Sequence, residues 1–447
     1  MSAGATADQF PGRRRKRIVS KQSGVPSFLL REKHLITLLL AYLLCGMFFM
    51  LVPGTLIGVW NLLSISGQHS SAATAAGWID AHGHAQLFGW VSTFVLGIGY
   101  YNLPNLRKTA DHRFVLGWAI LILWASGVGL HWMSAIWQWQ PHLIMPLSAV
   151  LEVVAVALFL FASFQGHERQ KAANRKIDVA TMSIIGGSFG LLAGLVLILW
   201  QSLAYGGVPP AETRLLPIIT VLWLAIVPIA VGLSARWFPA IAGTAPYLPG
   251  AFLLALLADV GGVGGLLWGF KVPSAISILL ACGAWIYSLR IFVPAVTAAK
   301  TIGVHPSFPA FLRLSYLWLL IAAALAAWSA IAPQLIGMPG ASRHAVTVGF
   351  MSTLVLTVGP RMLPAFLGRD GLFSPRLMFL SLLFINSGCL LRVISQILGY
   401  QGSFAWAWCL LPLSGLIELL GFTLFVSNMI LTVRKPARID QLLKSGT

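Results

Sequence analysis

Long apolar stretches separated by short polar loops make up almost the whole chain. A membrane core about 30 Å thick needs about 20 mostly apolar helical residues to cross it. Twelve runs of that length occur in the sequence, at about 34–63, 79–104, 113–137, 142–164, 179–204, 214–239, 247–269, 273–299, 310–333, 343–366, 376–399 and 404–433. The pattern predicts an all-α integral membrane protein whose twelve transmembrane helices lie in a lipid bilayer.

The composition excludes an ordinary soluble enzyme. Of the 447 residues, 57% are hydrophobic and only 9% are charged, whereas soluble domains carry about 25% charged residues. The net charge of +18 does not indicate a nucleic-acid partner, because the basic residues lie in short loops between apolar runs. The four cysteines are scattered within apolar runs without a CxxC motif, so neither disulfides nor a zinc finger are expected.

The distribution of lysine and arginine predicts the orientation. Basic residues follow spans 2, 4, 10 and 12, whereas the loops 64–79 and 204–213 contain none. Cytoplasmic loops carry the excess of positive charge, so both termini are expected on the cytoplasmic side of a bacterial inner membrane. We therefore divide the chain into a basic cytoplasmic tail (1–33), a membrane domain (34–433) and a second cytoplasmic tail (434–447).

An internal repeat predicts how the spans are grouped. The 21 residues from His84 to Pro104 align with those from His344 to Pro364, with ten identities at an offset of 260. A fainter copy, Arg236–Gly243, matches 361–368. The copies fall on spans 2, 6 and 10, each the second helix of a group of four. Because repeats define architecture, we expect three four-helix repeats (about 34–164, 179–299 and 310–433) in a pseudo-threefold arrangement.

Two histidines that occupy equivalent positions in the repeat are candidate haem ligands. His84 and His344 lie at one depth near the outer ends of spans 2 and 10. Two imidazoles from two helices at one height suit the axial positions of a haem between them. The alternative is that both imidazoles hydrogen-bond across a helix interface without a metal. The sequence has no CxxCH motif, so we expect a non-covalent haem of the b type.

A second metal is predicted nearby on the outer side. Successive helical residues turn by about 100°, so His82 points away from His84, two positions further on. His82 is expected to face His131, at the end of span 3, and His142, at the start of span 4. Three imidazoles suit copper or non-haem iron. The alternative is a set of unrelated interfacial histidines within a belt of tryptophans.

Charged side chains within the spans complete the candidate site. Arg343 and Arg392 could pair with anionic groups such as haem propionates. Glu152 is a candidate to support or ligate the second metal. Asp259 and Glu418 could relay protons or be buried, hydrogen-bonded acids. The sequence identifies no catalytic residue.

Two motifs resemble the NnrS family, the segment from His82 to Trp90 (HGHAQLFGW) and the segment from His344 to Gly349 (HAVTVG). That family comprises haem- and copper-associated membrane proteins linked to nitric oxide metabolism and nitrosative stress. The resemblance implies a haem protein that binds nitric oxide or converts it in a redox step, with quinol as the electron donor. Two alternatives stay open: a haem or metal transporter, and a quinol-dependent oxidoreductase similar to nitric oxide reductase.

The plan of three groups of four also resembles subunit I of the haem–copper oxidases. In that family a low-spin haem is held by histidines on the second and tenth helices, which map onto His84 and His344. The sequence departs from the family in span 6, from Arg214 to Pro239, which contains no histidine, and in span 10, which has a single one. The oxygen-reducing binuclear centre of those oxidases is therefore not expected.

Overall fold

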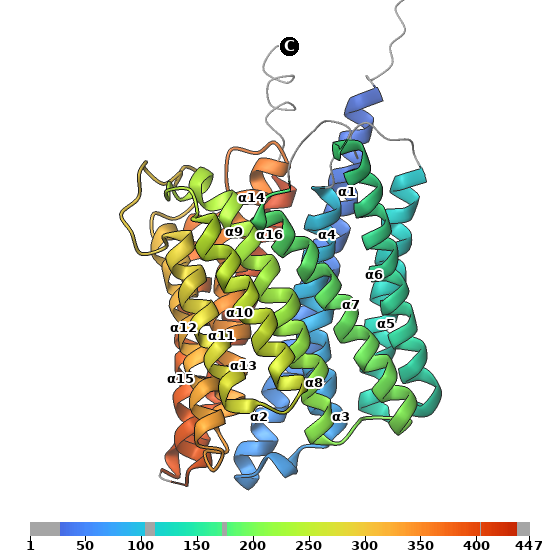
Figure 1. The fold of residues 1–447 in the computed structure, drawn as a ribbon, viewed down its shortest axis with the longest axis vertical. Helices are drawn as coiled ribbons and strands as arrows, with labels where there is room; N and C mark the ends of the chain where they lie inside the picture. Colours follow the sequence, from blue (N-terminus) through green and yellow to red (C-terminus); the bar gives the residue numbers. More distant parts are fainter. Residues whose placement is uncertain (1–26, 103–111, 172–176, 403, 436–447) are drawn as a thin grey trace, which may run out of the picture.

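The protein is a bundle of long helices (Figure 1). The computed structural model describes residues 27–102, 112–171, 177–402 and 404–435, and all regular structure within them is helical. Eleven helical segments of this part of the chain are long and apolar enough to cross a membrane. The remaining predicted span, span 2, is a continuous helical run from Ala76 to Tyr101. The expected all-α membrane protein is thus confirmed.

Four spans lie in each third of the chain. Those of the first third are α1–η1–α2 (Ser27–Phe49, Met50–Leu56, Ile57–Gln68), α3–η3–α4 (Ala76–His84, Ala85–Ser92, Thr93–Tyr101), α5 (His112–Trp137) and α6 (Pro141–Lys171). Those of the second are α7 (Val179–Tyr205), α8–η5–α9 (Ala211–Val221, Leu222–Ile226, Val227–Ile241), α10 (Pro249–Leu267) and α11 (Lys271–Leu289). Those of the last are α12 (Phe308–Ile331), α13–η6–α14 (Met338–His344, Ala345–Ser352, Thr353–Phe366), α15 (Pro375–Tyr400) and α16 (Trp406–Arg434).

The first helix begins earlier than the apolar pattern indicated. It starts at Ser27, seven residues before the predicted start of span 1, because a helix can continue through polar residues beyond the membrane. Most of the expected tails, 1–26 and 436–447, lies outside the described residues. Figure 1 shows the start of α1 and the end of α16 at the same end of the bundle.

Residues that favour helix ends define where α7 begins and ends. The side chain of Asp178 accepts a hydrogen bond of 2.8 Å from the backbone N–H of Thr181 and so caps the start of α7. Partial burial favours a higher pKa for Asp178, but hydrogen bonds from Thr181 and Arg236 outweigh it and hold the pKa below its ordinary value. At the other end of α7, Gly206 adopts a φ of 63°, a left-handed conformation that glycine accepts at little cost.

Helix contacts connect the bundle in a consistent way. The third and fourth spans of each third pack along one another as the hairpins α5–α6, α10–α11 and α15–α16. Neighbouring thirds meet where α6 packs on α7 and where α11 packs on α12. The last helix, α16, packs against η1 and α2 of the first span, so the end of the chain returns to its beginning.

The second span of each third contains a stretch of π-helix. These stretches are η3, η5 and η6, and a fourth, η1, lies in span 1. The segments η3 and η6 begin at the residue that follows His84 and His344, respectively. Short π-helical stretches are rare and are found frequently at functional sites, because they change the direction of side chains and carbonyl groups.

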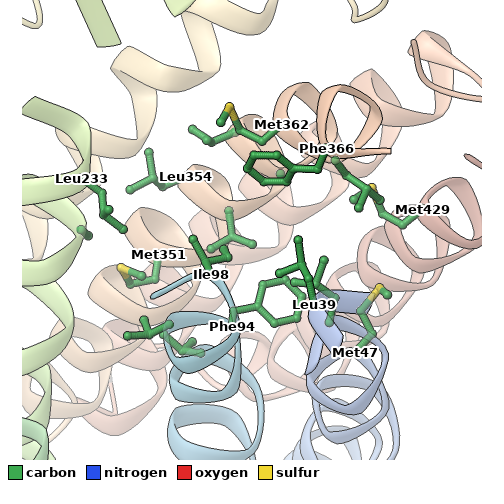
Figure 2. A pocket seen from close by; sticks show the side chains of 18 of the residues that line it. Leu39, Met47, Phe94, Ile98, Leu233, Met351, Leu354, Met362, Phe366 and Met429 are labelled. Atoms are coloured by element: carbon green, nitrogen blue, oxygen red, sulfur yellow. The ribbon is translucent and has the colours of Figure 1, made fainter. Parts of the chain in front are cut away.

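An apolar cavity lies among α1, α4, α9, α14 and α16. Figure 2 shows side chains from these segments pointing into it, including Met47, Phe94, Leu233, Met351 and Phe366. No charged residue lines it. The cavity begins seven residues beyond His84 and His344 along their helices, at Val91 and Met351.

We predict that α7 tolerates an added methyl group at one glycine and not at another. A Cβ at Gly190 would clash with the backbone carbonyl of Leu224, whereas a Cβ at Gly186 would meet no atom within 4 Å. Gly190→Ala should therefore lower the free energy of unfolding by about 1–3 kcal/mol, the usual cost of overpacking. Gly186→Ala should match the wild type. Thermal unfolding in detergent measures both, and equal stabilities of the two variants would contradict the packing.

Candidate functional site

His84 hydrogen-bonds a buried carboxylate on the fourth span. Its Nε2 lies 2.9 Å from Oε1 of Glu152, which belongs to α6. His84 is 5% exposed and Glu152 is fully buried. The direction of this bond depends on protonation, because an ionised Glu152 accepts from Nε2–H, whereas a protonated Glu152 donates to Nε2. Isolated polar groups at membrane depth are costly, and the hydrogen bond offsets that cost for both partners.

His344 forms the same bond in the last third of the chain. Its Nε2 lies 2.8 Å from Oε1 of Glu418 on α16. In both thirds, therefore, the histidine at the end of a helix in the second span bonds a glutamate on the fourth span. The sequence repeat paired the two histidines, and the structure adds a matching glutamate to each.

A glycine on the third span lets each glutamate approach. A Cβ built on Gly127 would lie 2.7 Å from Cγ of Glu152, and one built on Gly388 would lie 2.6 Å from Cγ of Glu418. Only glycine leaves this space, so α5 and α15 approach the glutamate side chains closely. The backbone contact matches as well, since these two positions face the carbonyl oxygens of Ser148 and Ser414.

The middle third keeps this glycine contact without the polar pair. Gly262 faces the carbonyl oxygen of Ser274 and would place a Cβ 2.8 Å from Cγ1 of Ile278. Isoleucine thus stands where the other thirds have glutamate. Ile219 occupies the position that the repeat offsets assign to the histidine. Histidine and glutamate are therefore replaced together, which indicates that they act as a unit.

His131, on the third span, joins the first histidine–glutamate pair. Its Nε2 lies 2.8 Å from Oδ2 of Asp80, and its ring stacks on that of His84 with centroids 3.7 Å apart and planes at 4°. Asp80, His84 and His131, together with Arg214, line a cavity with about 460 Å³ of empty space. The offset that relates Gly127 to Gly388 places Arg392 at the position of His131.

His82 points to the other side of its helix, as the 100° turn per residue indicated. Its Nδ1 lies 2.9 Å from the carbonyl oxygen of Gly54 in η1, and its ring packs on Gly58 of α2. The side chains that contact His84, by contrast, are Glu152, His131 and Phe88.

The structure groups the expected ligands differently from the sequence prediction. It brings His131 next to His84 and places His82 against η1 and α2. His142 is exposed near the start of α6 and makes no hydrogen bond to another histidine in the described chain. Within these residues no three histidine, cysteine or carboxylate side chains are placed to hold one metal ion, so the assignment of a second metal to His82, His131 and His142 stays a prediction.

The two arginines expected near a haem lie close to the candidate ligands. Arg343 precedes His344 and is partly buried, and the charge of Arg214 acts on it. Arg392 has a buried Nε and a buried Nη1 that donate to no group in the described part of the chain. Unpaired buried N–H groups are costly, so the Arg392 guanidinium can still receive an acceptor.

Sequence reasoning missed which groups hold the histidines. Glu152 and Glu418 were considered as separate acids, although a Ser-x-x-x-Glu pattern recurs at Ser148 and Ser414 and could have linked them. The carbonyl of Gly54 could not have been found, because no residue type marks a backbone acceptor.

The arrangement of helices is that of the haem–copper oxidases. A solved structure of a haem–copper terminal oxidase dimer superimposes with a TM-score of 0.58 over 91% of this chain and 85% of that chain, at 14% identity. The chain matches the family model of the NnrS protein over residues 40–436 and belongs to that family, which confirms the resemblance of the two histidine motifs.

Curated relatives share shorter segments with the chain. Cytochrome c oxidase subunit 1 of Thermus thermophilus is 26% identical over 136 residues, which are 25% of this chain and 24% of that protein. A second sequence of that name from Thermus thermophilus is 31% identical over 88 residues, covering 18% of this chain and 79% of its own length. The chain thus spans about a quarter of the first of these relatives.

We predict that His84 and Glu152 are energetically coupled. Glu152→Ile alone leaves a buried imidazole N–H without its acceptor, at a cost of about 1–3 kcal/mol. In the double variant His84→Ile/Glu152→Ile the pair becomes apolar, as in the middle third, so the loss of stability should be smaller than the sum of the two single losses by about 0.5–3 kcal/mol.

The free energies of unfolding in detergent of the wild type, the two single variants and the double variant measure this coupling. As a matched control, His84→Ile is combined with Glu418→Ile, because Glu418 bonds His344 and not His84. The control cycle should be additive. Additivity in the His84–Glu152 cycle as well would show that the hydrogen bond contributes no coupling.

Proposed function

We propose that the protein is a haem-binding protein of the bacterial inner membrane that acts in nitric oxide metabolism or nitrosative stress resistance. The haem is held non-covalently between the second and tenth spans, with His344 as one ligand and a histidine of span 2 as the other. The sequence prediction names His84 as that second histidine. Membership of the NnrS family and the oxidase-like fold support a haem protein.

The observation that supports this proposal is that each candidate histidine has a hydrogen bond at one of its two ring nitrogens. His82, His84, His131 and His344 each have one ring nitrogen bonded to a backbone carbonyl or a carboxylate. In the described chain their other ring nitrogens form no hydrogen bond to protein. Metal-ligating histidines almost always have this arrangement, because the outer hydrogen bond fixes the tautomer and the direction of the ring. The donor set therefore fits a metal-bearing group.

The residues of this chain have separable tasks in the proposal. Glu418 orients His344, and the unpaired N–H groups of Arg392 are available to a propionate of the haem. A bound haem with both histidines in place would supply one-electron redox chemistry, and it would bind a diatomic gas after loss of one histidine.

The apolar cavity is suited to the uncharged partners of the proposed function, nitric oxide and quinol. Nitric oxide and the tail of a quinol are apolar and partition into cavities that contain no charge. The cavity of Figure 2, with its lining of leucine, methionine and phenylalanine, offers such a place on the inner side of the histidines. Quinol is the proposed electron donor, with an oxidoreductase similar to nitric oxide reductase as one form of the activity.

We also propose that the three thirds of the chain are related by a pseudo-threefold axis. The three hairpins α5–α6, α10–α11 and α15–α16 support it, as do the equivalent contacts of Gly127, Gly262 and Gly388. The location of the start of α1 and the end of α16 at one end of the bundle, together with the basic loops, supports cytoplasmic termini.

Optical spectra of the purified, haem-supplemented protein test the function. We expect sharp bands after reduction with dithionite, a change of spectrum on addition of nitric oxide, and loss of the sharp bands in His344→Ala. His142→Ala, at an exposed position, is the matched control and should keep them.

A featureless spectrum after haem supplementation would refute the proposal. Labile metal without a stable haem spectrum would favour a transporter. Turnover of nitric oxide with a quinol would identify the protein as an enzyme.

A further inference from the structure

Two histidines of span 2, His82 and His84, are available to pair with His344, and they lie on opposite sides of their helix. His84 is directed to the first third of the chain by Glu152 and His131. We propose that His82, and not His84, is the histidine that completes the ligand site of His344. This inference rests on the proposed haem function and assigns the ligands of that site.

The contact with span 1 gives His82 a defined tautomer. A backbone carbonyl can only accept, so the bond of 2.9 Å to Gly54 requires the proton on Nδ1. In a neutral imidazole the lone pair then lies on Nε2, the nitrogen that would bind a metal. The proton is placed without a carboxylate, so no ionised group competes for it.

Two glycines of span 1 leave space beside the His82 ring and the neighbouring Gln86 side chain. A Cβ on Gly58 would come within 2.6 Å of Cε1 of His82, and one on Gly54 within 2.6 Å of Nε2 of Gln86. Gly58 therefore lets α3 approach α2 at His82, and Gly54 lies against the side chain of Gln86 in η3. The π-helical segment η1, which contains Pro53, ends one residue before α2 and presents the Gly54 carbonyl toward span 2.

The packing contacts of the two histidines separate them into two sites. His82 packs on Gly58 of α2, and the next residue of α2, Val59, packs on Gly415 of α16. Gly415 lies one turn before Glu418, which bonds His344. His84 stacks on His131 and bonds Glu152, and His131 bonds Asp80, so the second site contains two histidines and two carboxylates.

The geometry of the second site also disfavours His84 as a haem ligand. Its ring stacks on His131 at 3.7 Å, which is van der Waals contact and leaves no room for a macrocycle between them. The side chain would have to leave Glu152, His131 and the stacked neighbour Phe88 to reach the site of His344. His82 is held by none of these contacts, because it lies against η1 and α2 on the other side of span 2.

Optical spectra of matched variants test this assignment. In the haem-supplemented full chain, His82→Ala and His344→Ala should each abolish the spectrum of a haem with two histidine ligands, whereas His84→Ala and His131→Ala should keep it. Loss of that spectrum in His84→Ala with retention in His82→Ala would overturn the assignment.

A second pair of variants keeps every histidine in place. Gly58→Ala, on α2, displaces the ring of His82. Gly83→Ala, on α3 beside His82, adds a methyl group into open space. Disturbing an outer contact of a metal ligand weakens metal binding by about 10–100-fold, so we expect at least about tenfold weaker haem retention in Gly58→Ala and wild-type retention in Gly83→Ala.

This second comparison decides the case in which His82→Ala and His84→Ala both lose the spectrum through misfolding. Equal haem retention in the two glycine variants would overturn the assignment. A wild type that binds no haem would instead refute the proposed function, so the two failures are distinguishable.

Discussion

The burial of imidazole and carboxylate groups within an apolar bundle is the constraint on which the rest of the structure depends. Neither group can be removed from water alone without a large cost, so each must find its partner inside the protein. Glu152 and Glu418 meet this requirement by reaching across from the fourth span of their third of the chain. Close packing at Gly127 and Gly388 brings these partners within hydrogen-bond distance. A π-helical stretch begins directly after each histidine.

Much of the fold could be predicted from the sequence because membrane thickness limits helix length. The apolar runs predicted the order of the spans, and the all-helical membrane fold confirmed them. The ends of the helices were less predictable. At Ser27 the first helix begins seven residues before the predicted start of span 1, since helix formation and hydrophobicity are separate properties of the chain.

The candidate site was predictable in its residue types but not in its partners. Helical geometry correctly separated His82 from His84, because two residues along a helix always point in nearly opposite directions. What each side chain would meet depended on helices distant in sequence, such as span 1 with Gly54 and span 3 with His131. These contacts depend on how the helices rotate against one another, which a single sequence does not encode in a local pattern.

The middle third of the chain has a consequence for how such a protein can diversify. Its hairpin retains the close approach at Gly262 while Ile278 and Ile219 replace the polar pair, so the scaffold does not require a histidine or a glutamate to assemble. Ligand residues can then be lost or acquired in one third without loss of the others. Within this bundle, the close packing of a hairpin and the polar chemistry of a span can therefore change independently of one another.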